Sequence, residues 1–255
     1  MSTRLTPIIL RFDSLPSTNT EAARQVTLGA PEGLCVLARE QTAGRGRRER
    51  NWVSPKDAGL YFSVVLRPMF EARLWPLITL AAALAVREAL RAACELETDI
   101  KWPNDLLAGG RKLCGILAET ADSARGRAVI LGVGINLRRG SFPPEISDTA
   151  TSVEEQTGRA PDAERLLEAF TRALAACYET LQAHDGGEEI LREWQRRSTY
   201  AHGRRVRVAL NAESFEGTTR GLEPDGALRV ETDEGTLRIV RAGDVTALRQ
   251  AMSDK

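Results

Sequence analysis

The chain has 255 residues, 42% of them hydrophobic and 27% charged, which is the composition of a folded protein rather than a disordered one. Lysine plus arginine number 35, as do aspartate plus glutamate, and this zero formal charge argues against a dedicated nucleic-acid-binding protein. The basic residues are only four lysines, Lys56, Lys101, Lys112 and Lys255, and 31 arginines. Because the chain uses arginine for nearly all its positive charges, the few lysines suggest positions where arginine cannot replace lysine.

Helices and strands are predicted to mix over the first 200 residues. We expect a strand over 8–12, a helix over 18–28 with a Thr18–Glu21 capping box, a strand over 34–40, a polar loop over 41–58 and a strand over 60–67. A helix over 74–93, strands over 99–102, 112–119 and 128–133 with a turn through Gly109 and Gly110, and helices over 166–182 and 189–197 follow. From residue 203 short strands alternate with turns, over 205–210, 213–222, 227–232 and 236–241, as in a small β-barrel.

Cysteine usage and hydropathy predict a cytoplasmic protein without a membrane partner. The four cysteines, Cys35, Cys94, Cys114 and Cys177, form no CxxC pair, so reduced and mostly buried thiols are expected, and no zinc site. The first apolar run ends at Arg11, too early for a signal peptide, and no apolar stretch is long enough to cross a bilayer.

The most informative segment lies within the polar loop, where four arginines occur among six residues in Gly44-Arg45-Gly46-Arg47-Arg48-Glu49-Arg50. Their charges repel one another unless an anion joins them, and glycines allow the backbone close to a ligand. This pattern predicts an anion-binding loop, although it matches neither a P-loop nor a dinucleotide fingerprint. A solvated charged turn is the alternative, and Trp52 beside it either stacks on an adenine or belongs to the core.

Three further segments place polar groups at the ends of predicted strands. Lys101-Trp102-Pro103-Asn104-Asp105 delivers an amine, an amide and a carboxylate, although an Asn-Asp turn is a common alternative. Lys112 opens a strand in which Gly115 indicates close approach of a ligand or another chain segment. Gly134-Ile135-Asn136 ends the next strand with an amide.

Taken together, these segments resemble biotin protein ligases. The matching motifs, in order and spacing, are Ser17-Thr18-Asn19, the arginine loop, Lys101-Trp102-Pro103-Asn104-Asp105, Lys112-Leu113-x-Gly115-Ile116-Leu117-x-Glu119 and Gly134-Ile135-Asn136. The resemblance implies an α+β or α/β fold: a mixed-sheet, biotin/lipoate ligase-like catalytic domain over 1–200, then a small SH3-like β-barrel over 201–255. It implies that biotin and ATP form biotinyl-5′-AMP and pyrophosphate with Mg²⁺, and that a lysine of a biotin carboxyl carrier protein then takes the biotinyl group.

The resemblance also implies roles for individual residues. Lys112 and Asp105 would act in catalysis, with Lys112 near the carboxylate and the α-phosphate, while the Mg²⁺ ligands stay unassigned. The biotin site would comprise Ser17, Thr18, Asn19, Gln41, Gly44, Arg45, Gly46, Arg47, Lys112 and Gly115. The adenylate site would comprise Arg45, Arg47, Arg48, Arg50, Trp52, Lys101, Asn104, Lys112 and Asn136.

The sequence also departs from the family pattern and leaves alternatives open. Glu49 stands where the family often has glycine, which adds a negative charge and stiffens the loop. Too few residues precede Ser17 for the helix-turn-helix domain of the repressor branch, so repression is not expected. A lipoate ligase or octanoyltransferase is the nearest alternative, and a nucleic-acid-binding module and an inactive biotin sensor are others. A homodimer is one candidate for the oligomeric state.

Overall fold

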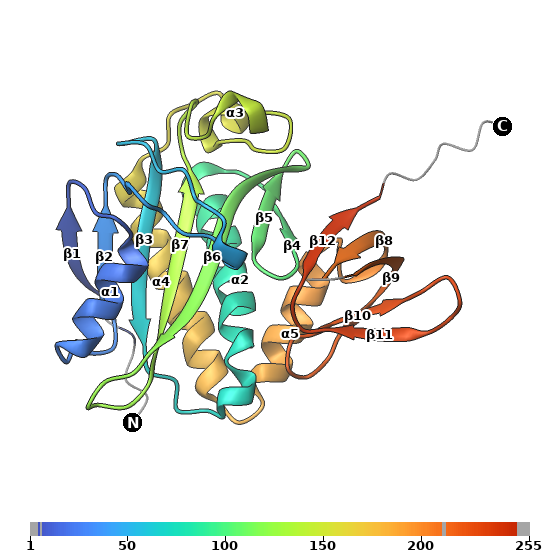
Figure 1. Ribbon diagram of the computed structural model, residues 1–255. Helices are drawn as coiled ribbons and strands as arrows, with labels where there is room; N and C mark the ends of the chain where they lie inside the picture. Colours follow the sequence, from blue (N-terminus) through green and yellow to red (C-terminus); the bar gives the residue numbers. More distant parts are fainter. Residues whose placement is uncertain (1–4, 6, 211–212, 249–255) are drawn as a thin grey trace.

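In the computed structural model, which describes residues 5, 7–210 and 213–248, a mixed sheet of seven strands occupies the centre of the first 200 residues (Figure 1). Its strand order is β1-β2-β3-β7-β6-β5-β4. The β1–β2 pair is parallel, whereas the other neighbouring pairs are antiparallel. The strands are β1 (Ile8–Phe12), β2 (Leu34–Ala38), β3 (Gly59–Leu66), β4 (Asp99–Lys101), β5 (Asp105–Ala108), β6 (Arg111–Ala121) and β7 (Ala128–Asn136).

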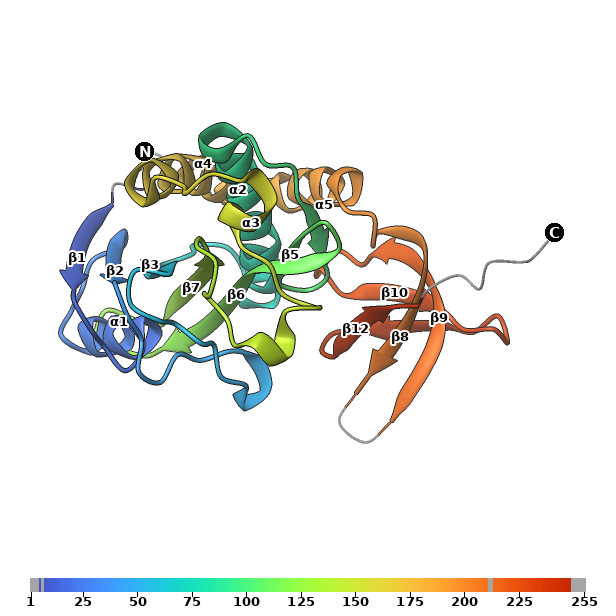
Figure 2. The same ribbon diagram turned by 90° about the horizontal axis from the view of Figure 1, so that it is seen from above.

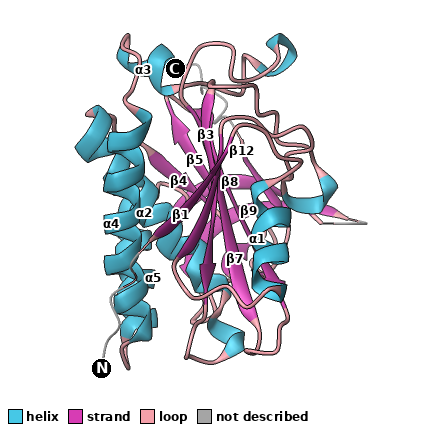
Figure 3. Cartoon of the chain, turned by 90° about the vertical axis from the view of Figure 1, so that its left-hand side faces the viewer, coloured by secondary structure: helices cyan, strands magenta, loops and turns pink. Residues whose placement is uncertain are grey.

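The two faces of this sheet are covered differently. Helices α2, α4 and α5 lie together on one face, whereas α1 lies on the other (Figures 2 and 3). The loop over 41–58 crosses the same face as α1 (Figure 1). The helices are α1 (Thr18–Thr27), α2 (Pro76–Cys94), α3 (Val153–Thr157), α4 (Ala163–Gln182) and α5 (Gly186–Arg197), with short 3₁₀ turns at Arg47–Glu49, Ala72–Leu74 and Pro144–Ile146.

Alternating side chains of β3 divide the core between these faces. Phe62 points toward α4, where its ring lies 4.8 Å from that of Phe170. Val65 belongs to the smaller apolar cluster beneath α1, together with Val26. The neighbouring Ser63 is fully buried on the α1 side and bonds to Asn19. The α1 face therefore carries the polar groups, while the other face is packed with helices.

A five-stranded antiparallel sheet forms the C-terminal part, in the order β11-β10-β9-β8-β12. Together with the mixed sheet, it confirms the predicted fold class. The buried Trp102 joins the two sheets, because its indole Nε1 donates to the carbonyl oxygen of Gly226 at 2.9 Å. The strands are β8 (His202–Ala209), β9 (Ser214–Leu222), β10 (Leu228–Glu231), β11 (Leu237–Val240) and β12 (Asp244–Ala247).

Several sequence-based boundaries were wrong. The turn expected after Pro103 contains the short strand β5, and β12 and α3 were not predicted. Helices α4 and α5 begin three residues earlier than expected, and the Asp162 side chain caps α4 by accepting from Glu164 N and Arg165 N. Strands of four residues, such as β5 and β12, carry too little alternation to be recognised without their pairing partners.

The predicted capping box at Thr18 was also wrong. Ser17 is the N-cap residue of α1, and its side chain makes no capping hydrogen bond. The hydroxyl of Thr18 instead contacts Gln41 and Ser63, so a tertiary network uses the group that the local pattern assigned to the helix end.

The four cysteines lie in or near the packed interior. Cys35, Cys94 and Cys114 are buried, Cys177 is half-buried, and all four are free. Burial raises the pKa of Cys35 to about 12 and that of Cys177 to about 11, so these thiols act as small apolar side chains. Within the described ranges, no helix has both the length and the apolar character that crossing a membrane requires.

We expect Trp102→Phe to lower the free energy of unfolding by about 2 kcal/mol, because it leaves the buried Gly226 carbonyl without its indole donor. Urea unfolding measures this loss. Trp75→Phe is the matched control, since Trp75 is only half-buried and its Nε1 bonds at 3.2 Å to nearby Phe70. Equal losses in the two variants would contradict a special role for Trp102.

Candidate active site

A cavity of about 210 Å³ lies between the α1 face of the large sheet and the C-terminal sheet, which contributes Asp244 and Val245. Its other walls come from the start of α1, the loop over 41–58 and the ends of β4 to β7. Every residue predicted for the site lines it except Gly44 and Arg48. The predicted residues in the wall are Ser17, Thr18, Asn19, Gln41, Arg45, Gly46, Arg47, Arg50, Trp52, Lys101, Asn104, Asp105, Lys112, Gly115 and Asn136.

Glycines flatten the sheet beneath this cavity. A Cβ atom at Gly134 would lie 2.4 Å from Nε1 of Trp52, and one at Gly132 would lie 2.1 Å from Oδ1 of Asn19. A Cβ at Gly115 would meet the Trp52 ring at 3.0 Å. These glycines within β6 and β7 thus let an indole and an amide lie directly on the sheet. The buried Trp52 Nε1, which faces Gly134 on the sheet, has no hydrogen-bond partner among the described residues.

One end of the cavity is buried, neutral and rich in hydrogen-bonding groups. The backbone N–H of Thr18 donates to Oε1 of Gln41 at 2.9 Å, and Nε2 of Gln41 donates to Ser54 at 2.8 Å. Thr18 and Asn19 are each only 4% exposed. This end suits an uncharged polar group with both donors and acceptors.

The arginine loop is a small hairpin rather than an extended strap. The amide of Gly46 donates to Arg50 O at 2.6 Å, and that of Trp52 donates to Gly44 O at 2.9 Å. A Cβ at Gly44 would lie 2.3 Å from Trp52 O, so Gly44 allows the chain to return on itself without lining the cavity. Glu49 has φ of 60°, in the region that favours glycine, which gives a physical reason for the family pattern at this position.

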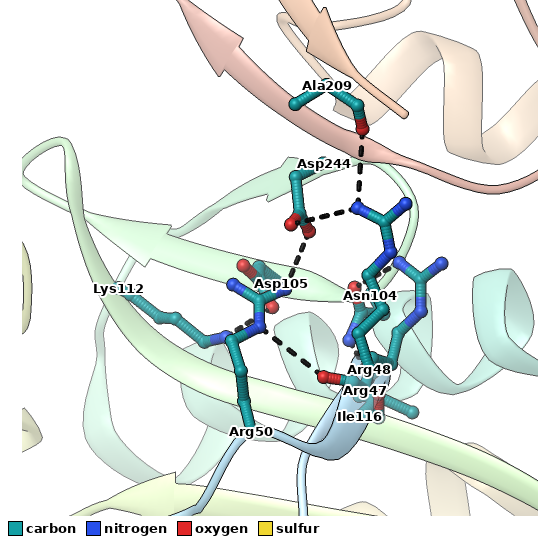
Figure 4. A network of polar contacts seen from close by, with 9 residues as sticks. All are labelled: Arg47, Arg48, Arg50, Asn104, Asp105, Lys112, Ile116, Ala209 and Asp244. Carbon is teal, nitrogen blue, oxygen red and sulfur yellow. Dashed lines mark hydrogen bonds and ion pairs between the residues drawn. The ribbon is translucent and has the colours of Figure 1, made fainter. Parts of the chain in front are cut away.

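The C-terminal sheet holds the other end of this hairpin (Figure 4). Asp244 accepts from Arg50 at 2.6 Å and from Arg48 at 3.4 Å, and Arg48 also donates to Ala209 O at 3.3 Å. Burial raises the pKa of Asp244, but the charge and hydrogen bond of Arg50 outweigh it, and the pKa lies below its ordinary value. Arg48 therefore binds the neighbouring sheet instead of facing the cavity.

Strand pairing brings the catalytic candidates together (Figure 4). Asp105 on β5 lies opposite Gly115 on β6, and its Oδ1 is 2.6 Å from Nζ of Lys112. The same Nζ lies 5.4 Å from the centre of the Trp52 ring. Lys101 is across from Asp105 on β4, and burial, the largest cause, lowers its pKa. Two amines and a carboxylate thus meet beside the indole.

The two asparagines predicted to contact the nucleotide also hold the backbone. Asn104 donates to Ile116 O at 2.7 Å and accepts from Arg47 at 3.2 Å. Asn136 donates to Thr151 O at 2.9 Å and is 4% exposed, so it ties the segment after β7 to the sheet.

Sequence reasoning missed the cover of the cavity. Ser141, Phe142, Ile146 and Ala150 line it from the loop after β7, and Asp244 lines it from β12. Two apolar residues in a segment rich in glycine and proline were the available signal for this cover. Asp244 had no local signal, because its position depends on how the two sheets meet.

No group of three or more metal-ligating side chains occurs in the part of the chain that the structure describes. The acidic residues in the cavity wall are Asp105 and Asp244, and both already bond to cationic side chains.

Known proteins share this sequence and fold. The Biotin/lipoate A/B protein ligase family matches residues 11–136, and the Biotin protein ligase C terminal domain matches residues 201–246. The biotin–[acetyl-CoA-carboxylase] ligase of Mycobacterium tuberculosis is 36% identical over 239 residues, covering 91% of this chain and 86% of that protein. The chain belongs to the biotin protein ligase family.

Solved structures from this family agree. The biotin protein ligase of Aquifex aeolicus in complex with biotin and ATP has a TM-score of 0.81 at 28% identity, covering 95% of this chain and 99% of that one. The Leishmania major enzyme in complex with biotinyl-5-AMP has a TM-score of 0.64 at 26% identity, covering 93% and 100%. The resemblance seen in the sequence is confirmed, and these relatives do not favour the lipoate alternative.

We expect Gly134→Ala to lower the free energy of unfolding by about 2 kcal/mol, because its Cβ would displace Trp52 from the sheet. Gly115→Ala should cost less, since the Cβ contact there is longer. Urea unfolding of both variants gives the comparison, and a Gly115→Ala loss as large as that of Gly134→Ala would contradict this packing.

We expect Asp244→Asn to loosen the arginine hairpin, so that the amides of Gly46 and Trp52 exchange with solvent about fivefold to tenfold faster. Because the folded pKa of Asp244 is lowered, its contribution is present above the ordinary aspartate range and is lost as pH falls through the folded pKa. The variant should lose this pH dependence.

Asp233→Asn is the control for the hairpin measurement, because Asp233 pairs with Arg205 in the same C-terminal sheet region, away from the hairpin. Hydrogen exchange followed by mass spectrometry measures both variants. Equal acceleration by both, or by neither, would show that Asp244 does not hold the hairpin.

Proposed function

We propose that the cavity joins biotin to ATP and then passes the biotinyl group to a carrier protein. An oxygen of the biotin carboxylate attacks the α-phosphorus, the bond to the β-phosphate breaks, and biotinyl-5′-AMP and pyrophosphate form. A lysine amine of the carrier then attacks the carbonyl carbon, AMP leaves, and the amine loses a proton. The observation that carries the proposal is five cationic side chains in one cavity beside a neutral polar end.

The charges and the polar groups divide the cavity between the two substrates. Ser17, Thr18, Asn19 and Gln41 would hold the ring system of biotin at the neutral end, with Gly115 beneath it. Arg45, Gly46 and Arg47 would clamp the acyl-phosphate, and Lys112 would stabilise the charge that develops at the α-phosphate. Lys101, Arg50, Trp52 and Asn136 would contact the adenylate, with Asn104 positioning Arg47. The segment with Phe142 and Ile146 would keep water from the reactive intermediate.

Asp105 has two roles that follow from its place. In the free protein it balances Lys112 at 2.6 Å, and once phosphates engage Lys112 its carboxylate is free to orient the incoming amine. Asp105 and Asp244 are the carboxylates in the cavity wall that would be candidates to hold Mg²⁺, which would supply positive charge to the ATP phosphates.

The acceptor follows from the names of the relatives. The Mycobacterium tuberculosis and Paracoccus denitrificans proteins are biotin–[acetyl-CoA-carboxylase] ligases. We infer that the partner of this chain is the biotin carboxyl carrier domain of such a carboxylase, met in the cytoplasm.

We expect Lys112→Ala to slow biotin-dependent exchange of pyrophosphate into ATP about a hundredfold, because it removes the positive charge nearest the reacting groups. The fold should survive, since Lys112 is about a third exposed near the start of β6. Lys56→Ala is the matched control, because Lys56 is exposed on the loop and lies outside the cavity. Normal exchange by Lys112→Ala would contradict the assignment.

A further inference from the structure

Glu119 adjoins the cavity and has no part in the reaction proposed above. It lies on β6, with its side chain 33% exposed. One oxygen, Oε2, accepts from Nδ2 of Asn19 at 2.7 Å and from Nη2 of Arg45 at 2.5 Å. It therefore touches both the neutral end of the cavity and the arginine loop.

Glu119 determines which way round the amide of Asn19 lies. An ionised carboxylate only accepts hydrogen bonds, so the NH₂ end of Asn19 must face it. The backbone oxygen of Leu117 lies 3.4 Å from the same Nδ2 and is a second, weaker hydrogen-bond acceptor for it. The amide oxygen Oδ1 must then face Ser63, and the distance from Ser63 Oγ is 2.6 Å.

The orientation of the Asn19 amide determines which groups donate and which accept in the hydrogen bonds that join Asn19, Ser63 and Thr18. Ser63 has one hydroxyl proton, and it donates this proton in its shorter hydrogen bond, at 2.6 Å to Oδ1 of Asn19. The 2.7 Å contact between the Ser63 and Thr18 hydroxyl oxygens must then be bridged by the proton of Thr18. Oε1 of Gln41, 3.2 Å from the same hydroxyl, is also only an acceptor, and the Thr18 backbone N–H fixes it.

The protein therefore uses the single hydroxyl proton of Thr18 internally. Thr18 lines the cavity, so it offers a ligand a lone pair and no proton. Such a position recognises an N–H group and rejects a carbonyl oxygen.

We propose that Glu119 is a positioning residue that fixes the Asn19 amide and, through it, the Ser63 hydroxyl, so that Ser63 joins Gln41 as an acceptor for the Thr18 hydroxyl and Thr18 accepts an N–H of the urea ring of biotin. This inference rests on the proposed function. The urea ring presents N–H donors next to a carbonyl acceptor. A pocket selects such a group when each of its own side chains is fixed as either a hydrogen-bond donor or a hydrogen-bond acceptor. Glu119 acts at a distance, through Asn19 and Ser63, and touches no reacting atom.

Glu119→Gln tests this series of hydrogen bonds. The carboxamide of glutamine can donate a hydrogen bond, so the Asn19 amide can rotate by half a turn and present its oxygen to residue 119. We expect the KM for biotin in pyrophosphate exchange to rise about tenfold, the scale of one misdirected hydrogen bond, while kcat changes less than about twofold. Glu164→Gln is the matched control, since it removes an exposed pairing with Arg11 at 2.6 Å far from the cavity, and its KM should stay unchanged.

A double-mutant cycle separates this series of hydrogen bonds from the loss of the Arg45 ion pair. Ser63→Ala interrupts the series, so adding Glu119→Gln to it should raise the KM no further, beyond about twofold. Independent effects that multiply, or an unchanged KM in Glu119→Gln alone, would overturn the inference. Circular dichroism and urea unfolding confirm that each variant is folded.

Pyrophosphate exchange by the wild-type protein distinguishes failure of the proposed function from failure of this inference. Wild-type protein without biotin-dependent exchange would refute that function, whereas normal wild-type exchange with a multiplicative cycle would refute only the role of Glu119.

Discussion

Repulsion between like charges inside one cavity is the constraint on which the rest of the structure depends. Arg45, Arg47, Arg50, Lys101 and Lys112 all line the same space, where their charges repel one another. Three carboxylates from three different strands balance three of these cations. Arg45 pairs with Glu119 on β6, Lys112 pairs with Asp105 on β5, and Arg50 pairs with Asp244 on β12. The cations are thus held in place before any substrate anion arrives.

This arrangement explains why both sheets contribute to one site. The C-terminal sheet supplies Asp244, and Trp102, at the end of β4, anchors that sheet through Gly226. The same strand end carries Lys101 and leads into Asp105, so anchoring the sheets and presenting these two cavity side chains depend on one turn. Beneath the cavity, glycines replace side chains that would fill the space needed by Trp52 and Asn19.

The sequence was most informative where chemistry is encoded locally. Lys101 to Asp105, Lys112 and Gly134 to Asn136 lie at or near strand ends that pairing brings to one cavity, and the loop over 41–58 adds the arginines. The family resemblance implied that these segments share one site. The sequence was least informative where a group is used by a distant partner. Thr18 forms a typical local capping pattern, yet its hydroxyl joins Ser63 and Gln41. Arg48 and Gly44 belong to the loop motif but serve its folding, and Asp244 and Phe142 enter the site only through tertiary contacts.

The most direct test of the account is mass spectrometry of a biotin carboxyl carrier domain incubated with this protein, Mg·ATP and either biotin or lipoate. The account predicts that biotin adds one biotinyl group to a single carrier lysine, with AMP and pyrophosphate released, and that lipoate gives no such product. Modification with lipoate alone would move the substrate assignment while keeping the chemistry. No adenylate and no carrier modification with either acid would contradict the central claim that this cavity joins two anions.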